Sequence, residues 1–449
     1  MEILKNNEYI VDIIDMGINA EGVAKIEGFP IFIKDGIIDE KVKIKIIKVS
    51  KDYAIGKIIE IIEKSKYREE PFCSQYVRCG GCNMQHIEYK KQLDIKMNQV
   101  KNSFKKFGLD ENKIIDIIGM DNPYEYRNKV QYPVGLDNNG EPVIGFYAPR
   151  SHDIVSNDIC KIEYAESAKI IRYIKQYIKD NNISIYDEIA GKGYLKHIVI
   201  KIGFNTKQIM VIFVTNNFSN GLKDLEKELV KNFEQVKTVV QNINMRNSNV
   251  IMGDENKVLY GNGYIQDKLG EYVFNISPNS FYQVNPVQAK VLYDIAKQYV
   301  ESANILFDLY CGIGTIGIYC SDISKEVYAI EIVEQAIEDA KVNAKNNNIN
   351  NITFLVGAVE EKINDLYSKN IEADCILVDP PRKGLDRKVI DVICNKRPDK
   401  IVYISCNNAT LARDIQLLKE HYELIECKLV DMFPHTSHIE CVCWLKKCE

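Results

Sequence analysis

The sequence predicts an α/β protein in three parts. We expect a small β-barrel over residues 1–65, a central α+β domain over residues 66–282 and a doubly wound α/β domain over residues 283–449. Three observations support this prediction: 449 residues can form several cores, short β-branched runs fill the start, and apolar runs alternate with helical stretches near the end. Such alternation is typical of a mostly parallel sheet with helices on both faces.

The N-terminal segment reads as a small barrel because its β-branched runs are short and evenly interrupted. Four glycines break these runs: Gly22, Gly28, Gly36 and Gly56. Lys41, Lys43 and Lys45 alternate with aliphatic residues, and a strand sends alternate side chains to opposite faces. The lysine face is either a phosphate-binding surface or an ordinary solvated face.

The central segment begins with a linker, "KYREEP", and then an amphipathic helix. Apolar residues recur at helical spacing between 93 and 104, and Gly108 can end the helix. Lysines fill the other faces and predict a basic outer side: Lys90, Lys91, Lys96, Lys101 and Lys105. Strand-rich, turn-rich sequence from about 123 to 280 completes an α+β domain.

The C-terminal segment contains seven apolar runs that predict strands. They lie at 305–308, 326–330, 352–356, 375–378, 400–404, 424–430 and 439–445. No clear helix separates the last two runs. We therefore expect them to form an antiparallel hairpin at one edge of the sheet.

Composition limits the class of protein. The net charge of −5 excludes a globally basic nucleic-acid coat, so RNA binding would use local patches. Thirteen scattered cysteines argue against a disulfide framework and for buried thiols, metal ligands or a nucleophile. No leader pattern is present, and no apolar run approaches the roughly 20 residues that cross a bilayer. We expect a cytoplasmic monomer without membrane association or an obligate protein partner.

A glycine-rich turn follows the first predicted strand of the C-terminal segment. In "DLYCGIGTIGI", Asp308 ends the strand, and Gly312 and Gly314 allow a ligand to approach the backbone. Glu331 ends the next strand, where a carboxylate can bridge two ribose hydroxyls. The third glycine of the dinucleotide fingerprint is displaced, and an acid at Asp308 suits the amino group of S-adenosylmethionine better than a pyrophosphate. The pattern therefore predicts an S-adenosylmethionine site.

The segment "VDPPRKGLD" places Asp379 and two prolines after the fourth strand. Prolines cannot continue the sheet ladder, so they fix an extended loop at the cofactor edge. Enzymes that methylate amino groups commonly have an aromatic residue after the prolines. Here Arg382 takes that position, which argues for another target atom.

Two further residues predict the chemistry. Cys406 ends the fifth strand just before a helix that begins near Ala409, and a thiol at a helix N-terminus can have a lowered pKa and act as a nucleophile. Glu440 lies two residues after His438, so we expect both to share a strand face. An acid among aliphatic and cysteine positions is a candidate general base.

A methyl donor and a nucleophilic thiol together indicate one reaction. Carbon 5 of a pyrimidine is too weakly nucleophilic to take a methyl group until a thiolate adds to carbon 6. After methylation, a base must remove the carbon 5 proton so that the thiolate can leave. We assign these roles to Cys406 and Glu440.

The motifs resemble, in order, those of the RNA uracil-5-methyltransferase family: "FNISPNSFYQVNP", "DLYCGIGTIGI", "VDPPRKGLD", "SCNNATLARD" and "HTSHIECV". The resemblance covers nearly the whole chain. It implies a Rossmann-like S-adenosylmethionine-dependent methyltransferase domain and an N-terminal TRAM-like, RNA-binding barrel. It also implies cofactor contacts from Gln283, Tyr310, Glu331 and Asp379. One departure is Asn408, where the family usually has proline, so we expect a less rigid turn.

Three cysteines lie close together in "CSQYVRCGGC", and a fourth lies far downstream in "SHDIVSNDIC". They are Cys73, Cys79, Cys82 and Cys160. This spacing suits an iron–sulfur cluster better than zinc, although an all-cysteine zinc site remains chemically allowed. The resemblance implies a 4Fe-4S cluster of the kind typical of members that modify 23S ribosomal RNA, whereas members acting on the tRNA T-loop are shorter and generally lack both cluster and barrel.

The sequence thus favours a 23S rRNA (uracil-5-)-methyltransferase. The first alternative is a tRNA T-loop uracil-5-methyltransferase. A non-catalytic RNA-binding or redox-sensing protein is an alternative of another class, against which the intact Cys406 and Glu440 argue. A cytosine-5-methyltransferase shares the chemistry but normally places its nucleophile in other contexts.

Overall fold

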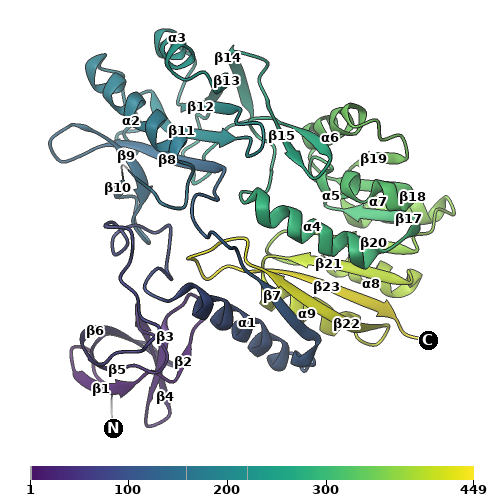
Figure 1. Cartoon of the computed structure of the whole chain (residues 1–449), viewed down its shortest axis with the longest axis horizontal. Coiled ribbons are helices and arrows are strands. Elements are labelled where there is room, and N and C mark those ends of the chain that lie inside the picture. The colour runs from purple at the N-terminus through teal and green to yellow at the C-terminus, as the bar shows by residue number, and fades with distance from the viewer. Residues whose placement is uncertain (1–2, 158, 220) are drawn as a thin grey trace.

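The computed structural model describes residues 3–157, 159–219 and 221–449. Residues 1 and 2 of the predicted barrel lie outside the described residues. Figure 1 shows three parts: a barrel that contains the N-terminus, a central sheet with two helices, and a larger C-terminal domain. The long helix α1 (Tyr89–Lys106) runs from the barrel along the C-terminal domain.

The N-terminal part is a six-stranded sheet with the order β1-β5-β6-β4-β3-β2. The strands are β1 (Glu8–Asp12), β2 (Asp15–Met16), β3 (Gly22–Ile26), β4 (Phe29–Lys34), β5 (Lys41–Val49) and β6 (Ala54–Glu63). Val42, Ile44 and Ile46 of β5 are fully buried, which confirms the predicted alternation with the lysines.

The predicted linker is anchored to the barrel by a buried ion pair. Glu40 is 1% exposed, and its Oε2 accepts hydrogen bonds from Arg68 Nη2 at 2.7 Å and from the Ile37 amide at 3.0 Å. A buried carboxylate needs such partners to offset its desolvation. The barrel is therefore held firmly against the segment that follows, residues 72–84, which we call the cysteine-rich segment.

The central sheet has seven strands in the order β10-β9-β8-β11-β12-β13-β14. They are β8 (Lys129–Leu136), β9 (Pro142–Tyr147), β10 (Ile154–Ser156), β11 (Leu195–Ile202), β12 (Ile209–Thr215), β13 (Val236–Ile243) and β14 (Glu255–Tyr260). Helices α2 (Ala165–Asp180) and α3 (Lys223–Asn232) share one apolar core with these strands. A hairpin of β15 (Ile265–Leu269) and β16 (Tyr272–Ile276) then leads into the C-terminal domain.

The C-terminal sheet has eight strands in the order β19-β18-β17-β20-β21-β23-β22-β7. All seven predicted strands are present: β17 (Ala303–Leu309), β18 (Ser324–Glu331), β19 (Ile352–Val356), β20 (Cys375–Val378), β21 (Lys400–Ser405), β22 (Tyr422–Val430) and β23 (Glu440–Lys447). Five of them are parallel, and this confirms the predicted α/β class.

Helices cover both faces of this sheet. One core contains residues of α4 (Pro286–Val300), α5 (Thr315–Tyr319) and α6 (Glu334–Asn346). The other contains residues of α7 (Val359–Ser368), α8 (Arg387–Lys396), α9 (Asn408–Leu418) and α1. The short 3-10 helices η1 (Glu111–Lys113) and η2 (Ser321–Ile323) complete the elements.

The predicted C-terminal hairpin is confirmed, but it does not form the edge of the sheet. β22 pairs with β23 in antiparallel fashion, and β7 (Ile114–Ile118) adds in parallel to the outer side of β22. Residues that the sequence assigns to the central domain therefore complete the C-terminal sheet, because the exposed edge of β22 needs a hydrogen-bonding partner.

Helix α1 confirms the predicted amphipathic helix, but Lys96 does not belong to its basic outer side. Lys96 is 0% exposed, and its Nζ lies 2.5 Å from Asp431 Oδ1 and 3.2 Å from the carbonyl oxygen of Phe433. The Tyr89 hydroxyl donates to Asp431 Oδ2 at 2.8 Å. Burial against the C-terminal domain overrides the charge pattern, because the helix must present this face to its neighbour.

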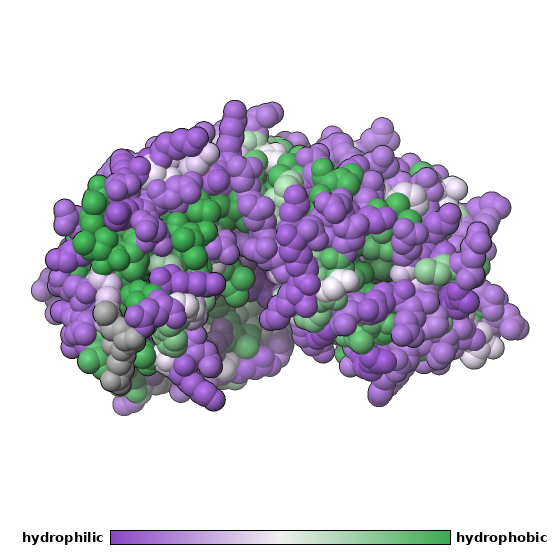
Figure 2. All heavy atoms as spheres, turned by 90° about the horizontal axis from the view of Figure 1, so that it is seen from below, coloured by the Kyte–Doolittle hydropathy of each residue, from purple (hydrophilic) through white to green (hydrophobic). Residues whose placement is uncertain are grey.

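The surface carries its exposed aliphatic residues unevenly. Figure 2 shows apolar side chains gathered over the barrel half of one face and a mostly hydrophilic surface over the other half. The exposed apolar residues of the barrel are Leu4, Ile10, Ile14, Ile18, Ile47, Val49, Ile59 and Ile62. Within the residues that the structure describes, no helix combines the length and apolar character needed to cross a membrane.

We predict that Lys96→Met lowers the free energy of unfolding by about 3–5 kcal/mol, because it leaves Asp431 buried without its cation. Urea denaturation of the purified protein measures this change. Lys113→Ala removes the exposed ion pair with Glu423 and should cost less than about 1 kcal/mol. Equal effects of the two substitutions would contradict the importance of the buried pair.

Candidate active site

Cys406 lies between β21 and α9, as predicted. Asn407 caps the helix, because its Oδ1 accepts hydrogen bonds from the amides of Ala409 at 3.1 Å and Thr410 at 3.4 Å. Asn408 is the first residue of α9, a position that proline also favours. The asparagine found in place of the family's proline thus leaves the start of the helix intact.

The "DPPR" loop packs directly against this turn. The carbonyl oxygen of Arg382 accepts hydrogen bonds from Asn407 Nδ2 at 3.0 Å and from the Thr410 hydroxyl at 3.2 Å. Arg413 Nη2 donates to the carbonyl of Lys383 at 2.9 Å. The loop after β20 and the turn after β21 therefore form one rigid unit around Cys406.

Glu440 begins β23 and is 5% exposed. Ser405 of β21 lies opposite Cys441 of β23, so the next pair in this register brings Cys406 and Glu440 together. His438 does not share a strand face with Glu440, contrary to the prediction. It precedes the strand and is exposed, because the chain turns before β23 begins.

The electrostatics of Cys406 also differ from the prediction. Burial, followed by the nearby charges of Glu440 and Asp379, raises the pKa of the thiol to about 11. Arg382 opposes this shift through its charge and a hydrogen bond. The net shift is upward and not downward, because burial of the thiol is its largest cause. Burial also raises the pKa of Glu440 well above its usual value.

Carboxylates gather at the carboxyl ends of β17, β18 and β20. Burial raises the pKa of Asp308 to about 7 and that of Asp379 to about 7. Asp308 Oδ2 is buried without a hydrogen-bond partner among the described residues. Glu331 Oε2 accepts from the Gly312 amide at 3.2 Å, and its Oε1 accepts from the Val333 amide at 3.0 Å.

The turn after β17 is left-handed at three places. Tyr310 has φ +67°, Gly312 has φ +55° and Gly314 has φ +77°. A side chain at Gly312 would meet no atom within 4 Å, so open space lies beside the backbone there. A non-glycine residue in this region costs free energy and is held by its surroundings, here by hydrogen bonds from Tyr310 and Cys311 to the Ile330 carbonyl.

Tyr293 belongs to none of the motifs in the sequence, and Thr315 lies in "DLYCGIGTIGI" without a role assigned to it, yet both lie at this site. The Tyr293 hydroxyl lies 3.0 Å from Thr315 Oγ1, and Gln283 also hydrogen-bonds to this tyrosine. Burial, with smaller contributions from the charges of Asp379 and Asp308, raises the pKa of Tyr293. Gln283 precedes α4 and is 7% exposed. A tyrosine in an apolar helix carries no signal in the sequence that separates it from a core residue.

Comparison with known proteins decides the family. Residues 88–448 match the family described as tRNA (Uracil-5-)-methyltransferase, and residues 4–59 match the TRAM domain. This chain belongs to the uracil-5-methyltransferase family. The predicted resemblance is therefore confirmed, including the N-terminal TRAM domain.

Relatives of this protein are similar to it over nearly their full lengths. A protein of Clostridium acetobutylicum, described as an uncharacterized RNA methyltransferase, is 46% identical and covers 99% of this chain and 98% of its own. A protein of Staphylococcus epidermidis with the same description is 45% identical over 98% of each chain.

A crystal structure has the same fold. The tRNA (uracil-54, C5)-methyltransferase of Pyrococcus abyssi, in complex with S-adenosyl-L-homocysteine, has a TM-score of 0.79 and 26% sequence identity. The match covers 97% of this chain and 99% of that one. This uracil-5-methyltransferase thus has the S-adenosylmethionine-dependent fold, uses S-adenosylmethionine and acts on RNA.

The TRAM-domain lysines are partly neutralised. Lys43 Nζ lies 2.8 Å from Glu8 Oε2, and Lys41 Nζ lies 3.9 Å from Glu63 Oε1. These contacts favour the interpretation of a solvated, ion-paired face over a phosphate-binding surface at Lys41 and Lys43.

The four predicted metal-ligating cysteines of this methyltransferase come together. Cys73, Cys79, Cys82 and Cys160 line one cavity of about 160 Å³. Burial raises the pKa of Cys82 to about 11 and also raises those of Cys79 and Cys160, and neighbouring thiols add to each shift. Among the described residues, no three histidine, cysteine or acidic side chains are arranged closely enough to hold a metal ion.

We predict that Arg382→Gln slows alkylation of Cys406 by iodoacetamide several-fold at pH 8. Arg382 lowers the pKa of this thiol, so its removal raises the pKa and reduces the fraction of reactive thiolate. Mass spectrometry of the Cys406 peptide measures the rate. Lys383→Gln removes a charge of the same sign from the next position and should leave the rate unchanged; a similar decrease in both variants would refute a specific effect of Arg382.

Proposed function

We propose that this enzyme methylates carbon 5 of a uridine in 23S ribosomal RNA through a covalent adduct with Cys406. The reaction rests on one observation: a thiol, a carboxyl group and a guanidinium meet where β20 and β21 end and β23 begins. A non-catalytic RNA-binding or redox-sensing protein would not need this arrangement.

In the proposed mechanism, Cys406 starts as the neutral thiol, since burial raises its pKa to about 11, and Glu440 acts as the ionised carboxylate. The thiol releases its proton to water as the uridine enters, and Arg382 stabilises the thiolate that forms. The thiolate adds to carbon 6, and the electrons of the carbon 5–carbon 6 double bond become available at carbon 5. S-adenosylmethionine, when bound, supplies the electrophilic methyl group.

Release of the methylated uridine from Cys406 requires a base. Glu440 takes the proton from carbon 5, the double bond forms again, and the carbon 6–sulfur bond breaks with its electrons returning to Cys406. A carboxylate with a raised pKa accepts a proton more readily than an ordinary one, and burial raises the pKa of Glu440. The environment of Glu440 therefore favours this role.

The cofactor residues proposed are Gln283, Tyr310, Glu331 and Asp379. Two observations support the fit: Asp308 Oδ2 is buried without a hydrogen-bond partner in the part of the chain that the structure describes, and the turn at Gly312 borders open space. Asp379 and Asp308 would pair with the methionine amino group, and Glu331 with the ribose hydroxyls. The two aspartates would then offset the cost of their burial by contact with a cation.

We also propose a 4Fe-4S cluster held by Cys73, Cys79, Cys82 and Cys160. Two observations support the proposal: four half-buried cysteines line one cavity, and neighbouring thiols contribute to the raised pKa values of Cys79, Cys82 and Cys160. A bound metal centre would oppose these shifts, since it takes up thiolate charge. An all-cysteine zinc site is the chemical alternative.

The cysteine cavity is the observation that favours 23S rRNA over tRNA. A tRNA uracil-5-methyltransferase is the second candidate, because the P. abyssi protein named for tRNA matches 97% of this chain. The expectation that tRNA-acting relatives are shorter does not hold for that protein. We infer that the TRAM domain contacts RNA and that the enzyme acts as a cytoplasmic monomer.

We predict that the purified enzyme, given S-adenosylmethionine, forms 5-methyluridine in unmodified 23S rRNA and not in a tRNA transcript. Mass spectrometry of nucleosides identifies the product, and mass spectrometry of nuclease fragments locates it. Cys406→Ala should abolish the product, because carbon 5 is not activated without the thiolate. Methylation confined to tRNA would overturn the choice of substrate, and methylation by Cys406→Ala would overturn the mechanism.

We predict about four iron atoms per chain in protein purified without oxygen, as a 4Fe-4S cluster requires. Iron analysis and the visible absorption spectrum measure the content. Cys160→Ser should lose most of the iron, whereas Cys394→Ser, on the outer helix α8, should retain it. Zinc without iron would reject the cluster and leave the methyltransferase reaction unaffected.

A further inference from the structure

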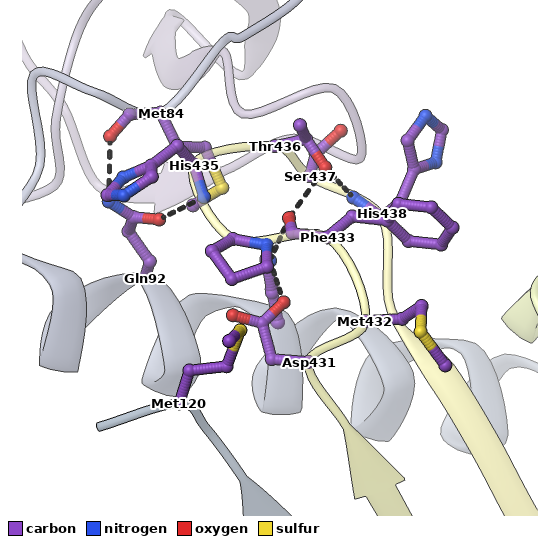
Figure 3. Close-up of polar contacts among 12 residues, drawn as sticks. Met84, Gln92, Met120, Asp431, Met432, Phe433, His435, Thr436, Ser437 and His438 are labelled. Atoms are coloured by element: carbon purple, nitrogen blue, oxygen red, sulfur yellow. Dashed lines mark hydrogen bonds and ion pairs between the residues drawn. The ribbon is translucent and has the colours of Figure 1, made fainter. Parts of the chain in front are cut away.

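The chain between β22 and β23, residues 431–439, leads directly into the proposed general base, Glu440. Figure 3 shows the polar contacts of this turn. His435, in its middle, has φ +64°, a left-handed conformation that costs a non-glycine residue about 1–3 kcal/mol. The side chain of Glu440 makes no hydrogen bond to another described residue. Its position therefore depends on the backbone that carries it.

Helix α1 holds the first half of this turn. Lys96 pairs with Asp431, and Gln92 Oε1 accepts a hydrogen bond from the His435 amide at 3.1 Å. Gln92 Nε2 lies 3.3 Å from His435 Nδ1. Figure 3 shows Gln92 reaching from the helix toward His435 and Met84.

The cysteine-rich segment forms hydrogen bonds with the second half of the turn. The amides of Asn83 and Met84 both donate to the His435 carbonyl, at 3.1 Å and 3.0 Å. Asn83 Oδ1 accepts from the Ser437 amide at 2.9 Å, and its Nδ2 donates to Ser437 Oγ at 3.1 Å. The same Nδ2 donates to the carbonyl of Asn19 in the TRAM domain at 2.9 Å.

Both ends of the cysteine-rich segment touch the turn. Asn83 directly follows Cys82, and Phe72, just before Cys73, packs edge-on against the His435 ring with centroids 4.9 Å apart. Tyr124 stacks on the same ring at 5.2 Å. The cysteine-rich segment, which lines the cysteine cavity, thus also packs against the turn before Glu440.

We propose that Asn83 is a positioning residue for Glu440, and that the cysteine-rich segment thereby controls release of the methylated RNA. The inference rests on the proposed role of Glu440. Ser437 lies three residues before Glu440, so a shift of the turn moves the carboxyl group. Cys406 and Arg382 follow β21 and β20, and the hydrogen bonds of Asn83 go to Asn19, His435 and Ser437 and not to these two residues.

This geometry separates two stages of the reaction. Addition of Cys406 and methyl transfer precede the need for a base. In the last step the carbon 5–hydrogen bond breaks, its proton goes to Glu440, its electrons form the carbon 5–carbon 6 double bond, and the carbon 6–sulfur electrons return to Cys406. A displaced Glu440 slows only this step, so the covalent RNA adduct accumulates.

The test uses full-length Asn83→Ala prepared without oxygen, unmodified RNA substrate and S-adenosylmethionine with a labelled methyl group. Rapid quenching measures S-adenosylhomocysteine in the first turnover, and denaturing gels measure the RNA–protein adduct. We expect the first turnover to stay within about twofold, the steady-state rate to fall about 10- to 100-fold, and the adduct to accumulate.

Three variants exclude a general structural effect. Asn83→Asp keeps the acceptor for the Ser437 amide and should partly restore the steady-state rate. Ser437→Ala removes the contact from the other side, outside the cysteine-rich segment, and should cause a smaller change of the same kind. Gln99→Ala removes a 2.8 Å hydrogen bond from α1 to the TRAM-domain carbonyl of Gly17 without touching the turn, and should not accumulate adduct.

Glu440→Gln separates failure of the inference from failure of the proposed function. If Glu440→Gln accumulates the adduct and Asn83→Ala does not, the positioning role is wrong and the proposed function stands. If Glu440→Gln does not accumulate it, the assignment of the base fails. If Asn83→Ala and Gln99→Ala behave alike, the effect comes from docking of the TRAM domain, and the inference is overturned.

Discussion

The ion pair between Lys96 and Asp431 is the contact on which the arrangement of this enzyme depends. Both side chains are fully buried, and Asp431 is the first residue after β22. A buried pair of this kind is tolerated only when both partners are in place. It therefore fixes the N-terminal half of the chain, through α1, to the turn that precedes the proposed base.

The TRAM domain, the central domain and the C-terminal domain are all linked to this turn by hydrogen bonds. The TRAM domain reaches it through Asn83, the central part through the Tyr126 hydroxyl on the Pro434 carbonyl at 3.0 Å, and α4 through Asn285 on the Met432 carbonyl at 3.0 Å. Under the proposed function, RNA contacts of the TRAM domain and the position of Glu440 would be linked through this turn. Cys406 follows the parallel strand β21, whereas Glu440 begins the antiparallel strand β23.

Much of the catalytic domain was predictable because its chemistry is local in sequence. The glycine-rich turn, the "DPPR" loop and Cys406 each follow directly after an apolar strand, and parallel strands bring their carboxyl ends to one edge. The direction of the pKa shift of Cys406 was not predictable, because its causes are burial, first, and then the charges of Glu440 and Asp379, which all depend on how separate strands pack. Tyr293 was missed for a similar reason: its partner Thr315 lies on another helix.

The sequence by itself determined the α/β class, the seven C-terminal strands and the family, and it supplied the proposed catalytic pair, since each depends on local periodicity or a short motif. Only the tertiary structure decided that β7 completes the C-terminal sheet, that Lys96 is buried, and that Asn83 holds the turn before Glu440. These features join residues hundreds of positions apart. Their energies come from desolvation and hydrogen bonds that exist only once the parts have packed together.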